Sequence, residues 1–189
     1  MQRAVREPPL RITQYVVLFK NEPLFTPDKK SLTMPQTVTI IDFMETRIAV
    51  MEHRGDPRLI GNSIRRFIEW RRRNHLPPSA SATFNILYDD PAEVPPEKFH
   101  IDLCAAVDRE MNDPGYGIVS GTIPAGRCAV LHHIGSDDTL GNSIRQLCNQ
   151  WLPISGETRR NFPIFLQRVR FFPEVPETEA VTDIFLPIE

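Results

Sequence analysis

The sequence lacks any apolar run that approaches the roughly 20 residues a membrane-spanning helix needs. Its first residues, MQRAVREPPLRITQYVV, also lack the apolar segment and the small-residue cleavage site of a signal peptide. Only three cysteines are present, Cys104, Cys128 and Cys148, and no two of them have the spacing of a disulfide framework or a zinc site. These absences predict a cytoplasmic protein that has no contact with membranes and carries no cofactor.

The sequence also lacks an excess of charge of one sign, because it contains 22 Lys and Arg residues and 24 Asp and Glu residues. A protein that coats DNA is normally basic, so we expect no direct nucleic-acid binding. The first 36 residues are too short and too rich in proline for a helix-turn-helix. The motifs GxSxG, GxGxxG and the P-loop are missing as well, and no nucleophile is indicated.

The most informative feature that is present is an internal repeat. Residues 47–65 (RIAVMEHRGDPRLIGNSIR) and 127–145 (RCAVLHHIGSDDTLGNSIR) align without gaps and are identical at ten of nineteen positions. The identities include His53 with His133, Gly55 with Gly135, and the GNSIR run. Two copies are too few for a solenoid, so we expect a closed pair of units related by a pseudo-twofold axis.

Each unit reads as two strands, a helix and two further strands. Asp56-Pro57 and Ser136-Asp137 suit a helix start, and apolar residues with helical spacing follow them. The helices are predicted to end before Pro77 and Pro153. Pro124-Ala125-Gly126 predicts a hairpin between its flanking strands. The predicted strands are 38–41, 47–51, 82–88 and 101–107 in the first unit, and 118–123, 127–131, 163–172 and 181–186 in the second.

This pattern predicts an α+β fold in which two pseudo-symmetric βαββ modules form an antiparallel sheet with the helices on one face. Module one spans residues 37–110 and module two spans residues 115–189, together one domain over 37–189. Residues 1–36 form an N-terminal arm, in which Tyr15 to Phe19 is a candidate additional strand.

The chain resembles the GyrI-like family, the effector-binding domain of AraC- and MerR-type regulators. The resemblance is carried by AVMEHRG (49–55), LYDDP (87–91), IDLCAAV (101–107), TIPAGRCAVLHHIG (122–135), WLPISG (151–156) and VTDIFLPI (181–188). It implies two βαββ (SHS2) modules with a small-molecule pocket at their junction. Family members are known as drug or metabolite sensors, as gyrase-inhibitor-like proteins and as hydrolases of cyclopropane-bearing toxins.

One departure from the family concerns the strand after WLPISG. Many members have an acidic residue there, followed two positions later by tyrosine, and these positions align with Leu166 and Arg168. In the family that acid commonly lies in the pocket and favours cationic ligands. Its replacement by leucine argues against cation binding and acid-assisted hydrolysis.

Glu52 is the polar residue that we expect in the pocket, because strand alternation places it on the same face as Val50. Pockets are mostly apolar with a few polar groups, so aromatic residues near the junction complete the predicted site. They are Trp70, Tyr88, Tyr116, Trp151, Phe162 and Phe165. His53 and His133 occupy equivalent strand ends, which favours a repeated structural hydrogen bond over a metal site that would also use His132.

We therefore expect a small-molecule binding domain of the transcription-regulator type, without its own DNA-binding domain, that recognises a small amphipathic or aromatic ligand. Two alternatives stay open. One is a hydrolase of strained or electrophilic molecules in which Glu52 is the catalytic group. The other is a gyrase-inhibitor-like protein that acts on a protein partner through its surface. Enzymatic activity is thus undecided, with the binding domain favoured.

Overall fold

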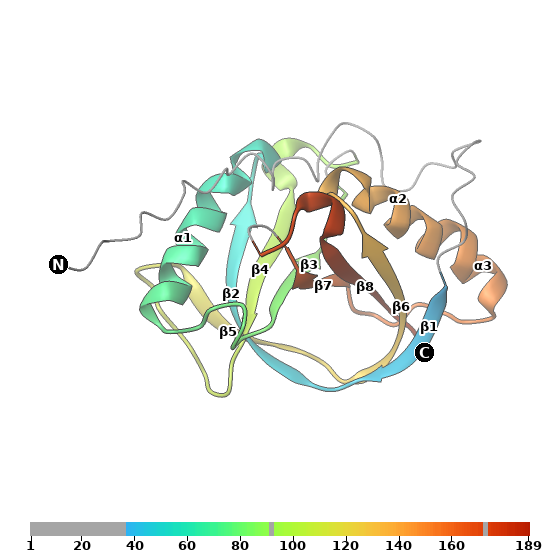
Figure 1. The fold of residues 1–189 in the computed structure, drawn as a ribbon, viewed down its shortest axis with the longest axis horizontal. Coiled ribbons are helices and arrows are strands. Elements are labelled where there is room, and N and C mark those ends of the chain that lie inside the picture. Colours follow the sequence, from blue (N-terminus) through green and yellow to red (C-terminus); the bar gives the residue numbers. More distant parts are fainter. Residues whose placement is uncertain (1–36, 91–92, 172–173) are drawn as a thin grey trace.

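The computed structural model describes residues 37–90, 93–171 and 174–189. These residues form a single antiparallel sheet of eight strands in the order β1-β6-β8-β7-β3-β4-β2-β5, with helices along one face (Figure 1). The strands are β1 (Val38–Phe43), β2 (Thr46–Arg54), β3 (Thr83–Leu87), β4 (His100–Ala106), β5 (Ile118–Ile123), β6 (Gly126–Ile134), β7 (Ile164–Arg170) and β8 (Val181–Pro187). The predicted α+β class is confirmed, and each predicted strand is present. The arm and its candidate strand Tyr15 to Phe19 lie outside the described residues, and the domain boundaries stay a prediction.

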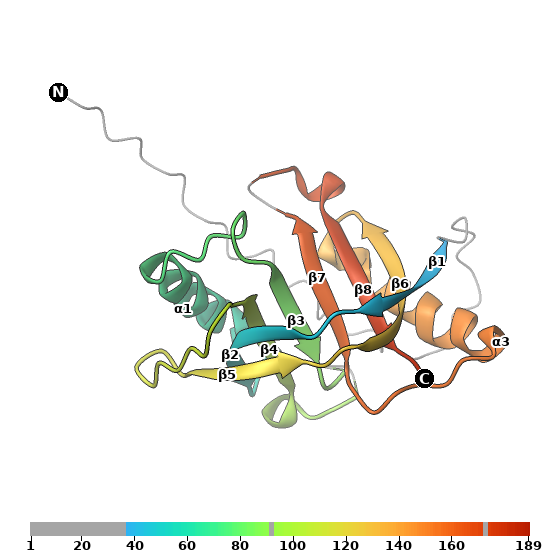
Figure 2. The ribbon, with the colours of Figure 1, turned by 90° about the horizontal axis from the view of Figure 1, so that it is seen from below.

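The predicted hairpin around Pro124-Ala125-Gly126 is wrong. Strand β5 pairs with β2, and β6 pairs with β1. The two strands that flank residues 124–125 therefore do not pair with each other, and each pairs with a strand of the first unit. The sum of the paired residue numbers stays constant from Val38↔Leu131 to Met51↔Ile118. The chain therefore passes straight from β1 to β2 and from β5 to β6, and the two long segments form one ribbon that joins the modules (Figure 2).

Burial explains why the chain crosses between modules instead of turning back. Ile118 is buried in the core under the first helix, whereas Cys128 is buried in the core that both modules share. A two-residue turn at 124–125 would bring β5 back onto β6 and remove Ile118 from module one. Turn-forming residues permit a hairpin but do not enforce one when the apolar side chains of each strand have partners elsewhere.

The first helix is confirmed close to its predicted bounds. A 3₁₀ turn at Pro57–Leu59 leads into α1 (Ile60–Arg73), and the Asp56 side chain accepts a hydrogen bond from the backbone of Arg58. This is the capping arrangement that the Asp-Pro sequence favours.

The second helix runs past the predicted stop at Pro153. It continues from α2 (Leu140–Arg145) through a π-helical turn at Gln146–Trp151 into α3 (Leu152–Ser155). The π turn shifts the hydrogen-bond pattern, so Pro153 falls in the first turn of α3, where no backbone donor is required of it. Gly156, with φ of 78°, then ends the helix in the left-handed region. None of the helices in the described ranges is long and apolar enough to cross a membrane.

Three apolar cores hold the described part of the chain together. One packs α1 against β2 and β4, and a second packs the helices of module two against β6, β7 and β8. The third lies on the sheet face away from the helices and is shared by both modules. Its centre is a group of phenylalanines in which the Phe165 and Phe185 rings stack with centroids 4.7 Å apart. The long ribbon curves beneath this face (Figure 1).

Candidate functional site

The two modules meet at the middle of the sheet, where β3 pairs with β7. Alternate residues of these two strands point toward the helices, since Phe84 and Phe165 belong to the core on the opposite face. We call the six helix-facing residues the seam floor. They are Thr83, Asn85, Leu87, Ile164, Leu166 and Arg168.

The seam floor is polar at one end and apolar at the other. Thr83 lies opposite Arg168, Asn85 opposite Leu166, and Leu87 opposite Ile164. Leu87 packs against both helix-side cores and so joins the two modules. The pseudo-symmetry of the backbone is therefore not repeated in the side chains, which form an amphipathic surface at the junction.

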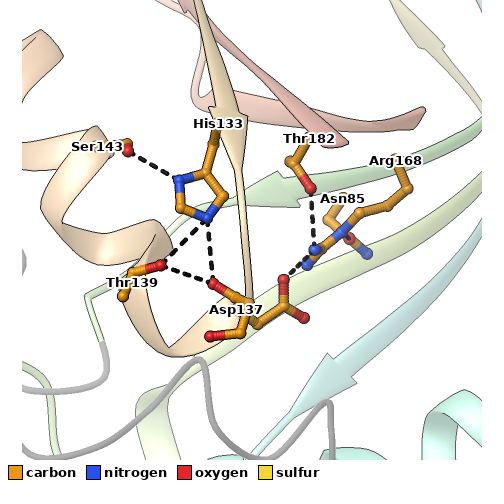
Figure 3. A network of polar contacts seen from close by, with 8 residues as sticks. Asn85, His133, Asp137, Thr139, Ser143, Arg168 and Thr182 are labelled. Carbon is orange, nitrogen blue, oxygen red and sulfur yellow. Dashed lines mark hydrogen bonds and ion pairs between the residues drawn. The ribbon is translucent and has the colours of Figure 1, made fainter. Parts of the chain in front are cut away.

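Arg168 is the principal charged group of this surface, and its side chain is only 4% exposed. Its Nε donates to Asn85 Oδ1 at 3.1 Å, and its Nη1 donates to Thr182 Oγ1 at 3.3 Å. Nη1 also forms an ion pair with the Asp137 carboxylate. Figure 3 shows these groups converging from three strands and from the turn before α2. Nη2, in contrast, is buried and has no hydrogen-bond partner among the described residues.

The position of Asp137 is fixed by a hydrogen-bonded turn at the end of β6. His133 Nδ1 lies 2.9 Å from Ser143 Oγ, and its Nε2 lies 3.1 Å from the backbone oxygen of Ser136. Thr139 Oγ1 donates to the same Ser136 oxygen at 3.0 Å. Burial lowers the pKa of His133, so the ring is neutral at pH 7 and can accept from the serine hydroxyl while donating to the carbonyl.

A second buried guanidinium reaches the polar end of the seam from the first helix. Arg71 Nη1 donates to Thr83 Oγ1 at 2.5 Å, while its Nη2 and Nε donate to the backbone oxygens of Ser81 and Leu76. Since Thr83 is the cross-strand neighbour of Arg168, both arginines bring positive charge to the same strand position.

Another polar cluster lies on the opposite sheet face. Asp102 accepts from Tyr88 Oη at 3.0 Å and lies 3.0 Å from His100 Nε2, and the Tyr88 and His100 rings stack with centroids 4.0 Å apart. Burial raises the pKa of both Asp102 and Tyr88. Ligand atoms of Glu52, His100 and Asp102 lie within 4.8 Å of one another, so these three side chains are the candidate metal ligands.

The structure divides the predicted site residues between the two faces of the sheet. Glu52 and Tyr88 adjoin Asp102 on the face away from the helices, where Glu52 forms an ion pair with Arg54 at 2.9 Å. Phe162 and Phe165 pack together on that face, with ring centroids 6.1 Å apart.

The other three predicted aromatic residues lie on the helix side of the sheet. Trp70 is 1% exposed in the core of module one, Tyr116 lies at the edge of that core and donates to Glu69, and Trp151 is half-buried against the core of module two. The described residues thus do not gather the predicted set into one pocket, and ligand contact by any of these residues stays a prediction.

Sequence reasoning missed Asn85, Asp137 and Thr182, and it noted Arg168 only as a departure. A signal was available in the strands, because Asn85 and Arg168 each interrupt an apolar strand sequence, ATFNILY and PIFLQRVRFF. A polar residue at a helix-facing position of a central strand is expensive to bury without a partner. Such a position marks a buried polar network or a ligand contact.

Comparisons with known proteins agree with this fold. The family profile described as GyrI-like small molecule binding domain matches residues 36–189. YgiV of Escherichia coli strain K12, a probable transcriptional regulator, is 36% identical over 152 residues, covering 80% of this chain and 95% of YgiV. The EcmrR C-terminal domain superposes with a TM-score of 0.67 at 18% identity, covering 82% of this chain and 99% of that one. SAV2435 bound to tetraphenylphosphonium superposes with a TM-score of 0.54 at 10% identity, covering 81% and 94%.

Proposed function

We propose, from the premise that this chain belongs to the GyrI-like small molecule binding domain family, that it binds a small amphipathic ligand on the seam floor. The observation that carries the proposal is the asymmetry of this surface. Arg168, Asn85 and Thr83 place polar groups at one end, where Thr83 is partly exposed. Leu87 and Ile164 are apolar at the other end, where Leu87 is partly exposed. A mostly apolar surface with a few convergent polar groups is the usual composition of a ligand site.

The position of the seam supports a sensing role. Leu87 packs against the cores of both modules, and Arg168 on β7 contacts Asn85 on β3 and Asp137 before α2. A ligand held here touches parts of both modules, so its binding energy can favour one relative placement of α1 and α2 over another. SAV2435, whose fold is similar, was determined with an aromatic small molecule bound.

We further propose that the occupied state acts on transcription in the cytoplasm. YgiV is a probable transcriptional regulator, and EcmrR has been determined in complex with DNA. The balance of 22 basic against 24 acidic residues supports an effect through a protein partner rather than through direct DNA binding. The hydrolase alternative rests on Glu52, whose side chain is 49% exposed and paired with Arg54.

Two matched tryptophan variants test the location of the site. Leu87→Trp places a larger ring on the seam floor, whereas Val169→Trp changes an exposed residue of β7. We expect aromatic compounds from a broad library to bind the parent chain and Val169→Trp with similar affinity, and to bind Leu87→Trp at least about tenfold more weakly. Equal binding by the two variants would show that the site does not lie on the seam floor. If neither the parent chain nor either variant shows saturable binding, the proposed function is refuted.

A further inference from the structure

We propose that the ligand carries a carboxylate or a similar anionic acceptor, and that this group pairs with Nη2 of Arg168. The inference rests on the proposed function, because it assigns the chemical class of the ligand on the seam floor. It starts from a buried donor that the protein leaves without an acceptor.

Nη2 of Arg168, unpaired among the described residues, is costly for the folded chain. A buried polar group without a hydrogen bond is unfavourable, and such groups are rare in folded proteins. Arg168 is buried at the module junction, and Nη2 has no partner among the described residues, although Nε and Nη1 each have one or more. A hydrogen-bond acceptor on a bound ligand removes this cost. Such a ligand therefore binds more tightly than a ligand of the same shape that lacks an acceptor.

The guanidinium of Arg168 is held in one orientation. Asn85 binds Nε of the guanidinium, and Thr182 and Asp137 bind Nη1. The orientation of Nη2 is therefore fixed before a ligand binds. Asn85 is itself held, because its amide donates to the backbone oxygen of Asp102 at 3.4 Å. A planar, preorganised guanidinium recognises a carboxylate with directional hydrogen bonds and loses little entropy when it does so.

The charges near Arg168 also affect which ligand is favoured. Two guanidinium groups reach this end of the seam floor: that of Arg168, which is paired with Asp137, and that of Arg71, which donates to the neighbouring Thr83. Positive charge in a buried setting repels a cation more strongly than it would in water. The seam therefore favours the opposite charge from that of tetraphenylphosphonium, the lipophilic cation bound to SAV2435. Leu87, which is partly exposed, is the apolar residue of the seam floor that an apolar body can contact.

Three compounds with one shared body test the assignment: 4-biphenylcarboxylate, 4-biphenylmethanol and 4-biphenylmethylamine. Binding is measured by calorimetry on the full chain. We expect the carboxylate to bind at least about tenfold more tightly than the alcohol, and the amine to bind most weakly. The double variant Arg168→Met with Asp137→Asn removes the guanidinium and does not leave the Asp137 carboxylate without its ion-pair partner. It should lose the carboxylate preference, so that the carboxylate and the alcohol bind to it within about threefold of each other.

A second measurement does not depend on the folding of a variant. In the parent chain, the Arg168 Nε–H resonance should shift on addition of the carboxylate and not on addition of the alcohol. Equal binding of carboxylate and alcohol would mean that water satisfies Nη2 and would overturn the inference, while the proposed function stands. A carboxylate preference that survives the double variant would also overturn it. If neither these compounds nor tetraphenylphosphonium bind at all, the proposed function itself fails.

Discussion

His53 and His133 occupy equivalent positions in the two modules and make the same two contacts. Each Nδ1 lies 2.9 Å from the hydroxyl of a serine in the GNSIR run, Ser63 in module one and Ser143 in module two. Each Nε2 approaches a backbone oxygen in the following turn, at 3.3 Å from Asp56 and 3.1 Å from Ser136. The predicted repeated structural hydrogen bond is confirmed, and it ties the end of a strand to the helix that follows.

These histidines predict a loss of stability in mild acid. Burial lowers the pKa of both rings below the ordinary value of 6.5. The unfolded chain therefore binds more protons than the folded chain as the pH falls below 6.5, and the folded state loses stability until the pH is below the folded pKa values. Urea unfolding at pH 7.5, 6.5, 5.5 and 5.0 measures the effect. His133→Gln should be less stable at pH 7.5 but should decline less between pH 6.5 and 5.0.

A matched substitution, His75→Gln, controls for the removal of a histidine as such, because His75 is exposed. It should leave the pH dependence of the parent chain unchanged. Parallel pH profiles for the parent chain and His133→Gln would contradict the assignment of the acid sensitivity to the buried rings.

The serine partners give a second prediction. Ser63→Ala and Ser143→Ala each remove the hydroxyl next to Nδ1, and each should lower the free energy of unfolding by about 1 kcal/mol at pH 7.5. The two sites lie in different modules, so their effects should add in the double variant. Chemical denaturation provides the measurement, with Ser79→Ala in an exposed turn as the control, expected within about 0.5 kcal/mol of the parent. A strongly non-additive double variant would contradict the independence of the two sites and would show that they are energetically coupled.

Local sequence signals were sufficient to predict most of the helices and strands. Asp56-Pro57 and Ser136 marked the helix starts, and the repeat placed equivalent strands in both modules. What they could not show was which strands pair. The connection at 124–125 has turn-forming residues, yet β5 joins β2 of the other module. Pairing depends on where each strand buries its apolar side chains, and that is a property of the assembled sheet.

The seam was harder to predict because its contacts are distant in sequence. Arg168 meets Asn85, Asp137 and Thr182, which come from another module, a turn and a neighbouring strand. The prediction placed Glu52 with Val50, and the structure does put them on one sheet face, but that face points away from the helices. Alternation along a strand tells which residues share a face, and only packing tells which face the helices cover.

The cluster around Asp102 gives a third prediction. Burial raises the pKa of Asp102, and the hydrogen bond from Tyr88 Oη at 3.0 Å opposes that rise. Tyr88→Phe removes the donor, so the pKa of Asp102 should rise further, and stability should fall more steeply as the pH rises through that pKa. The carboxyl ¹³C resonance of Asp102 reports its titration directly. Tyr116→Phe, which loses a hydroxyl bonded to exposed Glu69, should leave that titration unchanged.

The ion pair of Arg168 with Asp137 gives the last prediction, which concerns stability rather than ligand binding. The Arg168 side chain is 4% exposed and that of Asp137 is 19% exposed, so the loss of either partner leaves a poorly solvated charge. Asp137→Asn and Arg168→Met should each cost about 2 kcal/mol or more, and the double variant should cost less than the two together. A double-mutant cycle measured by urea unfolding yields the coupling free energy, expected at about 1–3 kcal/mol. The same cycle on Arg109 and Asp108, whose side chains are 70% and 86% exposed, should give less than about 0.5 kcal/mol. Equal coupling in the two cycles would show that the seam pair is as well solvated as a surface pair, and it would remove the reason for a preorganised guanidinium at the module junction.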